Sequence, residues 1–332
     1  MEKKINLDEK IFVAGARGMA GSAICRALYK NGYGTTNGGK VFKPTRKELD
    51  LLDIKAVRKW FKKYKPTIVI IAAAKVGGIL ANSIYPTQFL LENLKIQNNL
   101  IENAWHAGVK RLLFLGSSCI YPKLAKQPID EESLLTGQLE DTNQWYAISK
   151  ISGIKLCDAL RKQYNFDAIS LMPTNLYGPG DNYHPENSHV MASLIRKFFE
   201  ASRNFIPSVT CWGTGNPLRE FLYVDDLGDA VVFALENWDP NSKNAPKDKN
   251  NNPLTILNVG TGKDISIREL ANKISSSVKY NGEIIWDKNK PDGTPKKLLN
   301  IQKIKDLGWE PRISLKQGLK STIESYKKEN YS

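Results

Sequence analysis

The chain of 332 residues contains few cysteines and no long apolar run. Its four cysteines, Cys25, Cys119, Cys157 and Cys211, are widely spaced and form no C-x-x-C pair. This spacing argues against a disulfide framework or a zinc site, so we expect no metal. The sequence has no stretch of about 18 apolar residues and no apolar leader segment at its charged N-terminus. We therefore expect a cytoplasmic protein that does not bind a membrane.

Acidic residues are also scarce, at 34 against 48 lysines and arginines, and the formal net charge is +14. A basic balance can indicate a nucleic-acid partner, but these cations are spread along the whole chain. We find no nucleic-acid motif and no compact basic block interleaved with aromatic residues. A solvated basic surface that attracts anionic nucleotides is the simpler explanation, and we expect no nucleic-acid partner.

Glycines mark a nucleotide-binding turn near the beginning of the chain. An apolar strand over residues 10–14 leads into Gly15, Gly18 and Gly21, and a helical run follows over residues 22–30. Such a strand, glycine turn and helix can hold a pyrophosphate, because the glycines allow a tight turn and the helix start offers free N–H groups. The alternative is a glycine-rich turn without a ligand. The position of the turn at the start of an alternating pattern favours the dinucleotide site.

Strands and helices alternate regularly through the first half of the sequence. Continuous apolar runs over residues 67–74, 111–116 and 167–172 are typical of parallel strands buried on both faces, with helices at 54–64 and 86–107 between them. We predict an α/β fold with a Rossmann-type, doubly wound parallel sheet and a smaller C-terminal α/β substrate lobe. The expected boundaries are 1–178 for the cofactor domain and 179–332 for the lobe, with segments within 221–262 returning to the sheet.

The second strand predicts which dinucleotide binds. An NAD site usually has an acidic residue at the end of this strand, whereas arginine suits the 2′-phosphate of NADP. Here the strand over residues 40–43 runs towards Arg46, and Arg17 of the glycine turn can reach the same space. Two guanidinium groups can bind one phosphate through charge-assisted hydrogen bonds, which favours NADP(H). The alternative is a pair of solvated surface cations.

Tyr146 and Lys150 stand four residues apart on a predicted helix, so their side chains share one face. A neighbouring ammonium stabilises a phenolate and is expected to move the pKa of the tyrosine towards the working range. Ser117, upstream in the chain, can hold a carbonyl oxygen. The alternative for Tyr146 and Lys150 alone is an ordinary exposed pair. Together with the dinucleotide turn, however, the three residues favour ketone reduction.

Longer sequence words identify a resemblance to the extended short-chain dehydrogenases/reductases, over residues 11 to about 318. The words are Gly15-Ala-Arg-Gly-Met19, Ala72-Ala-Ala-Lys-Val-Gly-Gly-Ile79, Leu115-Gly-Ser-Ser-Cys-Ile-Tyr-Pro-Lys123, Met172-Pro-Thr-Asn-Leu-Tyr-Gly178, Asn187-Ser-His-Val190, Pro217-Leu-Arg-Glu-Phe221 and Lys290-Pro-Asp-Gly-Thr-Pro295. Within that family the chain is similar to the enzymes that act on GDP-sugars. Extra residues at 34–39, Lys197 in place of an arginine and Glu283 in place of another arginine depart from their pattern.

The resemblance implies NADPH-dependent conversion of GDP-4-keto-6-deoxy-D-mannose to GDP-L-fucose, by 3,5-epimerisation and then 4-keto reduction. It implies Cys119 as the base and His189 as the acid of epimerisation, with Tyr146, Lys150 and Ser117 serving the reduction. It also implies a homodimer that pairs through a four-helix interface.

Two further groups of residues follow from the resemblance. The implied cofactor-binding residues are Gly15, Ala16, Arg17, Gly18, Met19, Ala20, Gly21, Arg46, Asp50, Leu51, Leu115, Gly116, Ser117, Ser118, Lys150, Pro173, Thr174, Asn175, Leu176 and His189. The implied residues for the GDP end are Lys197, Trp212, Arg219 and Asp292, with Lys297 as an additional candidate.

Two alternative classes remain open at this point. The first is another nucleotide-sugar 4-epimerase or 4,6-dehydratase of the same fold. Dehydratases place an Asp-Glu pair just after the serine or threonine of the site, and Ser118-Cys-Ile120 carries no acid. The second is a nucleotide-binding protein without catalysis, which would require a broken set of catalytic residues. Ser117, Tyr146 and Lys150 are all present.

Overall fold

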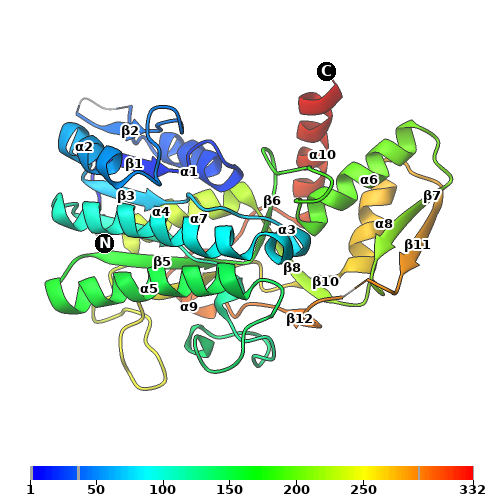
Figure 1. The fold of residues 1–332 in the computed structure, drawn as a ribbon. Coiled ribbons are helices and arrows are strands. Elements are labelled where there is room, and N and C mark those ends of the chain that lie inside the picture. The colour runs from blue at the N-terminus through cyan, green and yellow to red at the C-terminus, as the bar shows by residue number, and fades with distance from the viewer. Residues whose placement is uncertain (1–2, 36–37, 291, 332) are drawn as a thin grey trace.

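A six-stranded parallel sheet forms the larger lobe of the computed structural model, which describes residues 3–35, 38–290 and 292–331 (Figure 1). In order across the sheet, the strands are β2 (Lys40–Phe42), β1 (Lys10–Ala14), β3 (Ile68–Ile71), β4 (Arg111–Leu115), β5 (Ala168–Pro173) and β9 (Ile256–Val259). Every pairing between them is parallel. The predicted doubly wound sheet is confirmed.

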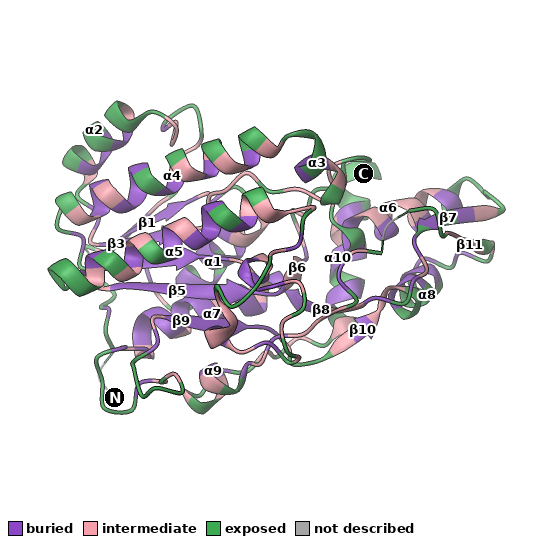
Figure 2. Cartoon of the chain, turned by 60° about the horizontal axis from the view of Figure 1, so that its bottom comes forward, coloured by how far each residue is buried: buried purple, intermediate pink, exposed green. Residues whose placement is uncertain are grey.

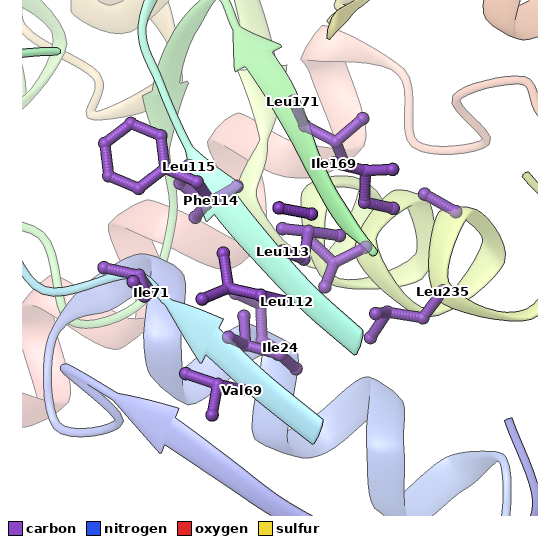
Figure 3. Close-up of a cluster of buried hydrophobic side chains, with 14 of the residues drawn as sticks. Ile24, Val69, Ile71, Leu112, Leu113, Phe114, Leu115, Ile169, Leu171 and Leu235 are labelled. Atoms are coloured by element: carbon purple, nitrogen blue, oxygen red, sulfur yellow. The ribbon is translucent and has the colours of Figure 1, made fainter. Parts of the chain in front are cut away.

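Helices cover both faces of this sheet (Figure 1). One face carries α2 (Ile54–Tyr64), α4 (Pro86–His106) and α5 (Gln144–Tyr164), and the other carries α1 (Met19–Lys30) and α7 (Val224–Asn237). The strands β3, β4, β5 and β9 are accordingly buried along their whole length, as the purple strands in Figure 2 show. Side chains of β3, β4 and β5 pack with Ile24 of α1 and Leu235 of α7 in one hydrophobic core (Figure 3). Burial on both faces explains why these strands are continuous apolar runs.

The smaller lobe has its own hydrophobic core and contains two small sheets. The first contains β6 (Asn175–Tyr177), β8 (Leu218–Tyr223), β10 (Asp264–Ser266) and β12 (Lys296–Lys297), and the second pairs β7 (Ser208–Trp212) with β11 (Glu283–Asp287). The helices of this lobe are α6 (Val190–Arg203), α8 (Ile267–Ser277) and α10 (Leu315–Tyr331). Short elements complete the chain: α3 (Ile79–Ile84), α9 (Gln302–Asp306) and the 3-10 helices η1 (Ser118–Ile120) and η2 (Glu131–Ser133).

The predicted element boundaries differ from the observed ones mainly at strand ends. The helix at 54–64 has the predicted bounds, and the helix at 86–107 ends one residue early, at His106. The run at 67–74 forms a strand only over Ile68–Ile71, because Ala72 and the residues after it leave the sheet to border the glycine turn. Of the insertion at 34–39, residues 36–37 lie outside the described residues.

Across the part of the chain that the structure describes, no helix is long and apolar enough to cross a membrane. Among the same residues, no group of three or more histidine, cysteine, aspartate or glutamate side chains is placed to hold a metal ion.

Candidate active site

The glycine turn after β1 is too tightly packed for larger side chains. Gly15 has a φ of +84°, and a Cβ on it would lie 2.7 Å from the backbone of Ala73. A Cβ on Gly21 would lie 2.1 Å from the carbonyl oxygen of Gly15. Gly18 stands at the N-cap of α1 without a side-chain cap. The turn therefore leaves the N–H groups at the start of α1, where Met19 and Ala20 stand, available to an anionic ligand. Ala16 lies in the same turn.

Arg17 and Arg46 lie at the same edge of the sheet, because β1 and β2 are paired in parallel and each arginine follows one of these strands. Both side chains are exposed. Arg17 interacts electrostatically with Lys43 and Glu48. Arg46 forms no ion pair with any residue that the structure describes. The two guanidinium groups are thus accessible to a phosphate.

The loop that follows Arg46 is held by backbone contacts. The carboxylate of Asp50 accepts a hydrogen bond of 3.0 Å from the N–H of Leu52, and the carbonyl oxygen of Leu51 accepts one of 2.8 Å from Asn99. The bond from Asn99 ties the edge of the predicted cofactor site to α4.

Lys150 and Tyr146 extend from α5 towards the end of β4. The buried Lys150 ammonium donates a hydrogen bond of 2.7 Å to the carbonyl oxygen of Leu115 and lies 5.8 Å from the centroid of the Tyr146 ring. Tyr146 also hydrogen-bonds with the side chain of Ser117. The structure thus brings together the three residues that the sequence predicted for ketone reduction.

The ionisation of this group differs from the sequence-based expectation. Burial raises the pKa of Tyr146, as does its interaction with Cys119, and the hydrogen bond with Ser117 opposes this rise. Burial lowers the pKa of Lys150 to about 7. The expected lowering of the tyrosine pKa by a charged lysine is therefore not the main effect here, because desolvation disfavours both charges.

Cys119 lies in η1, two residues after Ser117, whose side chain accepts a hydrogen bond of 3.2 Å from the Cys119 N–H. The thiol is half-buried and has two polar neighbours. The side-chain amide of Asn143 lies 3.6 Å from the Cys119 Sγ, and the Lys297 ammonium lies 3.8 Å from it. Cys119 also interacts electrostatically with Tyr146 and Arg219. The thiol and the tyrosine therefore belong to one site.

His189 stands at the N-cap of α6, at the end of a loop that borders α3. The N–H of Gly78 donates to the carbonyl oxygen of Asn187 at 3.2 Å, and a Cβ on Gly78 would lie 2.6 Å from the Ser188 oxygen. His189 is exposed, yet the protein around its imidazole lowers its pKa. Within the described residues the imidazole makes no hydrogen bond or ion pair, so the structure does not join His189 to Cys119.

The residues after β5 are anchored by the buried Glu220 of β8. Its carbonyl oxygen accepts hydrogen bonds from the Asn175 amide at 2.8 Å and from the Thr174 hydroxyl at 3.3 Å. One carboxylate oxygen of Glu220 accepts from the N–H groups of Thr261 and Gly262, and the other accepts from Leu299. Burial raises the pKa of Glu220, and these backbone hydrogen bonds oppose the rise. Pro173 and Leu176 flank the anchored pair.

The end of β4 is closely packed. A Cβ on Gly116 would lie 2.4 Å from the sulfur of Met172, and Ser118 is buried beside it. The ends of β1, β4 and β5 thus lie at one edge of the sheet, which is where ligands bind in open α/β sheets.

The four residues predicted for the GDP end gather around β7 and β8. The Lys197 ammonium donates a hydrogen bond of 3.0 Å to the carbonyl oxygen of Thr210, and burial lowers its pKa. Trp212, at the end of β7, is 48% exposed. The Asp292 carboxylate accepts hydrogen bonds of 2.7 Å from both the N–H and the hydroxyl of Thr214.

Arg219 connects this group to the thiol. Its guanidinium donates to the carbonyl oxygen of Asp292 at 3.4 Å and interacts electrostatically with Cys119. Glu283, which the sequence related to the nucleotide, is exposed at the start of β11.

The NAD dependent epimerase/dehydratase family model matches residues 11–250. This chain belongs to that family. The glycine turn, the Tyr146–Lys150 pair and Ser117, which lie at one edge of the sheet, agree with this membership.

Relatives within the NAD dependent epimerase/dehydratase family are similar over nearly the whole chain. The chain is 53% identical to GDP-L-fucose synthase 1 of Arabidopsis thaliana, over 96% of this chain and 93% of the relative. It is 49% identical to the GDP-L-fucose synthase of Escherichia coli K12, over 95% of this chain and 96% of the relative. A solved GDP-L-fucose synthetase from Naegleria fowleri bound to NADP is 27% identical and has a TM-score of 0.85, covering 99% of this chain and 97% of that one.

Sequence reasoning missed Asn143 and gave Lys297 a different position. Asn143 is the N-cap residue of α5 and precedes Tyr146 by three residues, so its position at the start of the predicted helix was the only local signal. Lys297 was predicted at the GDP end. Its contact with Cys119 joins positions 178 residues apart in the sequence, and no local sequence pattern predicts such a contact.

Proposed function

We propose that this protein is an NADPH-dependent GDP-L-fucose synthase, which epimerises GDP-4-keto-6-deoxy-D-mannose at C3 and C5 and then reduces its 4-keto group. One observation supports both activities: Cys119 lies in the same site as Ser117, Tyr146 and Lys150, so a proton-exchanging thiol and a carbonyl-reducing group share one substrate position. The curated relatives at 53% and 49% identity carry the same name.

The cofactor fits the available residues. The bare N–H groups after Gly18 would hold the pyrophosphate, and Arg17 and Arg46 would hold the 2′-phosphate. The nucleoside and the nicotinamide would be bordered by Asp50, Leu51, the end of β4 at 115–118 and the segment 173–176. Lys150 and His189 would also contact the cofactor. When bound, NADPH supplies the hydride that reduces C4.

Cys119 and His189 would carry the epimerisation. The 4-keto group acidifies the C–H bonds at C3 and C5, because loss of either proton leaves an enolate. Cys119 would remove the proton on one face of the sugar, and His189 would return one on the other face.

Tyr146 and Ser117 would carry the reduction. Because Tyr146 and Ser117 are hydrogen-bonded to each other, their two hydroxyl groups are adjacent and would both bind the C4 oxygen of the substrate. Because burial raises the pKa of Tyr146, the hydroxyl keeps its proton until the oxygen becomes negative, and Tyr146 then donates it. Lys150, held by Leu115, orients this end of α5.

Lys197, Arg219, Trp212 and Asp292 would bind the GDP end. The two cations would contact the diphosphate, Trp212 offers an exposed ring face, and Asp292 would accept a hydrogen bond from a ribose or base donor. We accordingly assign the cofactor to residues 1–178, with parts of 221–262, and the nucleotide-sugar to the lobe at 179–332.

We further propose a homodimer that pairs through α4 and α5. Apolar side chains are exposed on these helices, including Leu91 of α4 at 47% and Ile148 of α5 at 37%. Two such helices from each copy would form a four-helix interface across a two-fold axis. A cytoplasmic location stays a prediction.

The direct test incubates the purified protein with GDP-4-keto-6-deoxy-D-mannose and either NADPH or NADH, and identifies the product. We expect GDP-L-fucose, with NADPH preferred. A product that retains the configuration at C3 and C5 would indicate a simple reductase instead. Release of a dehydrated or 4-epimerised sugar would indicate one of the related nucleotide-sugar enzymes.

A further inference from the structure

Two cationic side chains on neighbouring strands face the Cys119 thiol. Lys297 of β12 stands directly opposite Arg219 of β8 in the parallel register of the two strands. Residues opposite each other in a register project on the same face of a sheet. Lys297 contacts the sulfur at 3.8 Å, whereas Arg219 interacts with it only electrostatically.

Hydrogen bonds on both sides of Lys297 fix its backbone. The side-chain amide of Gln127 donates to the carbonyl oxygen of Lys296 at 3.1 Å, and the side-chain oxygen of Gln127 accepts from the N–H of Leu298 at 2.9 Å. The N–H of Leu299 then donates to the buried Glu220 carboxylate at 3.0 Å. The contact between Lys297 and Cys119 is thus part of a braced strand rather than of a free surface loop.

We propose that Lys297 is a positioning residue for epimerisation, which holds the Cys119 sulfur as a thiolate and so prepares it to remove the protons at C3 and C5. Asn143 assists, because its amide lies 3.6 Å from the same sulfur. This inference deepens the proposed function and rests on it. An ammonium beside a sulfur favours the charged thiolate, and the thiolate is the reactive form.

The proton balance of the step is simple. The thiolate accepts the proton from C3 or C5, the C–H bond breaks, and the electron pair remains on the sugar as an enolate stabilised by the 4-keto group. No electron is gained or lost by the protein. Lys297 keeps its own proton throughout and compensates the negative charge before the transfer.

A test must distinguish the effect of Lys297 on the thiol from the effects of the other charged groups around it. Tyr146 and Arg219 interact electrostatically with Cys119, and Arg219 also interacts electrostatically with Glu140 and Asp292. Glu140 is paired with Lys123 at 3.3 Å. Lys296 provides a matched control, because it neighbours Lys297 on β12 and forms an ion pair with Asp264 at 3.3 Å instead of contacting the thiol.

The experiment measures carbamidomethylation of Cys119 by iodoacetamide in protein without substrate, from about pH 5.5 to 9.5, an interval that spans the usual thiol titration. Peptide mass spectrometry separates Cys119 from the three buried cysteines. The proteins compared are the wild type, Lys297→Met, Lys297→Arg and Lys296→Met. The plateau rate at high pH reports access to the sulfur, and the midpoint of the profile reports thiolate formation.

We expect the Lys297→Met midpoint to rise by about one pH unit, so that labelling at pH 7 slows about tenfold, while Lys297→Arg and Lys296→Met resemble the wild type. An unchanged midpoint in Lys297→Met would overturn the proposal, and so would an equal shift in Lys296→Met. If Lys297→Met fails to fold, Lys297→Gln replaces it under the same criteria. Because no sugar is present, this outcome does not depend on whether the proposed substrate is turned over.

Discussion

The buried ammonium of Lys150 donates its hydrogen bond to the carbonyl oxygen of Leu115, two residues before Ser117. This contact ties α5 to the end of β4, so the helix that carries Tyr146 and the strand end that leads to Ser117 and Cys119 are fixed relative to each other. A 2.7 Å bond to a neutral oxygen does not offset the burial of a full charge, and the lowered pKa of Lys150 reflects this cost.

The first prediction concerns the stability of the cofactor-free protein against pH. The pKa of Lys150 is about 7 in the folded chain against an ordinary value of 10.5, so between these values the unfolded chain holds more protons at this position. The free energy of unfolding should therefore rise with pH across that window, with a contribution of up to about 1.4 kcal/mol per pH unit from Lys150. Below pH 7 both states are protonated, and this contribution is constant.

The Lys150→Met variant should lose this part of the slope. Urea unfolding between about pH 7.5 and 9.5 measures it, in the range where the two states differ in proton binding. Lys155→Met is the matched control, because Lys155 is exposed on the same helix and pairs with Asp158. Equal slopes for Lys150→Met and the wild type would show that Lys150 remains charged in the folded protein.

The second prediction separates the two activities of the site. Cys119→Ser should slow deuterium incorporation from heavy water at C3 and C5 by about 10²–10⁴-fold, because it lacks a thiolate as the base. His189→Asn should behave similarly. Tyr146→Phe should leave this exchange within a few-fold of the wild type but stop the oxidation of NADPH, because the C4 oxygen would lack its proton donor.

Both quantities can be followed together, by mass spectrometry of the sugar and by NADPH absorbance. If Tyr146→Phe abolished the exchange while Cys119→Ser retained it, the assigned roles would be wrong, and Tyr146 would also handle the epimerisation proton.

The third prediction concerns the choice of cofactor. Arg46 is exposed and free of ion pairs in the described structure, so Arg46→Gln should disturb no internal contact. Loss of one charge-assisted contact with the 2′-phosphate should cost about 1.5–3 kcal/mol, or roughly ten- to a hundredfold in NADPH affinity. The affinity for NADH should hardly change. Fluorescence titration measures both, with Arg58→Gln on α2 as the control, and an equal weakening of the two cofactors would refute the role of Arg46.

The fourth prediction concerns assembly. The wild type should be a dimer at micromolar concentration by size-exclusion chromatography with light scattering. Introducing charges through Leu91→Asp and Ile148→Asp should yield monomers, since two carboxylates would be buried in an apolar interface. Leu124 is 85% exposed and lies outside α4 and α5, so Leu124→Asp should remain dimeric. A monomeric wild type would exclude the proposed interface.

The sequence by itself determined the parallel sheet and the edge at which ligands bind. Apolar runs such as the one at 111–116 are typical of strands buried on both faces, and Gly15, Gly18 and Gly21 directly after the first strand indicate a tight nucleotide-binding turn. The pairing of Tyr146 with Lys150 also follows from local spacing, because helical geometry is periodic. Each of these features depends on residues close together in the chain, so it can be predicted from the sequence alone.

Only the tertiary structure decided the environment of each reactive group. The sequence predicted that Lys150 would lower the pKa of Tyr146, but burial, which no local pattern records, raises that pKa and lowers the pKa of Lys150 itself. The contact of Lys297 with Cys119 likewise depends on the register of β12 against β8. Electrostatic effects follow distance in space and exposure to water, and both are set by packing between residues that are far apart in the chain.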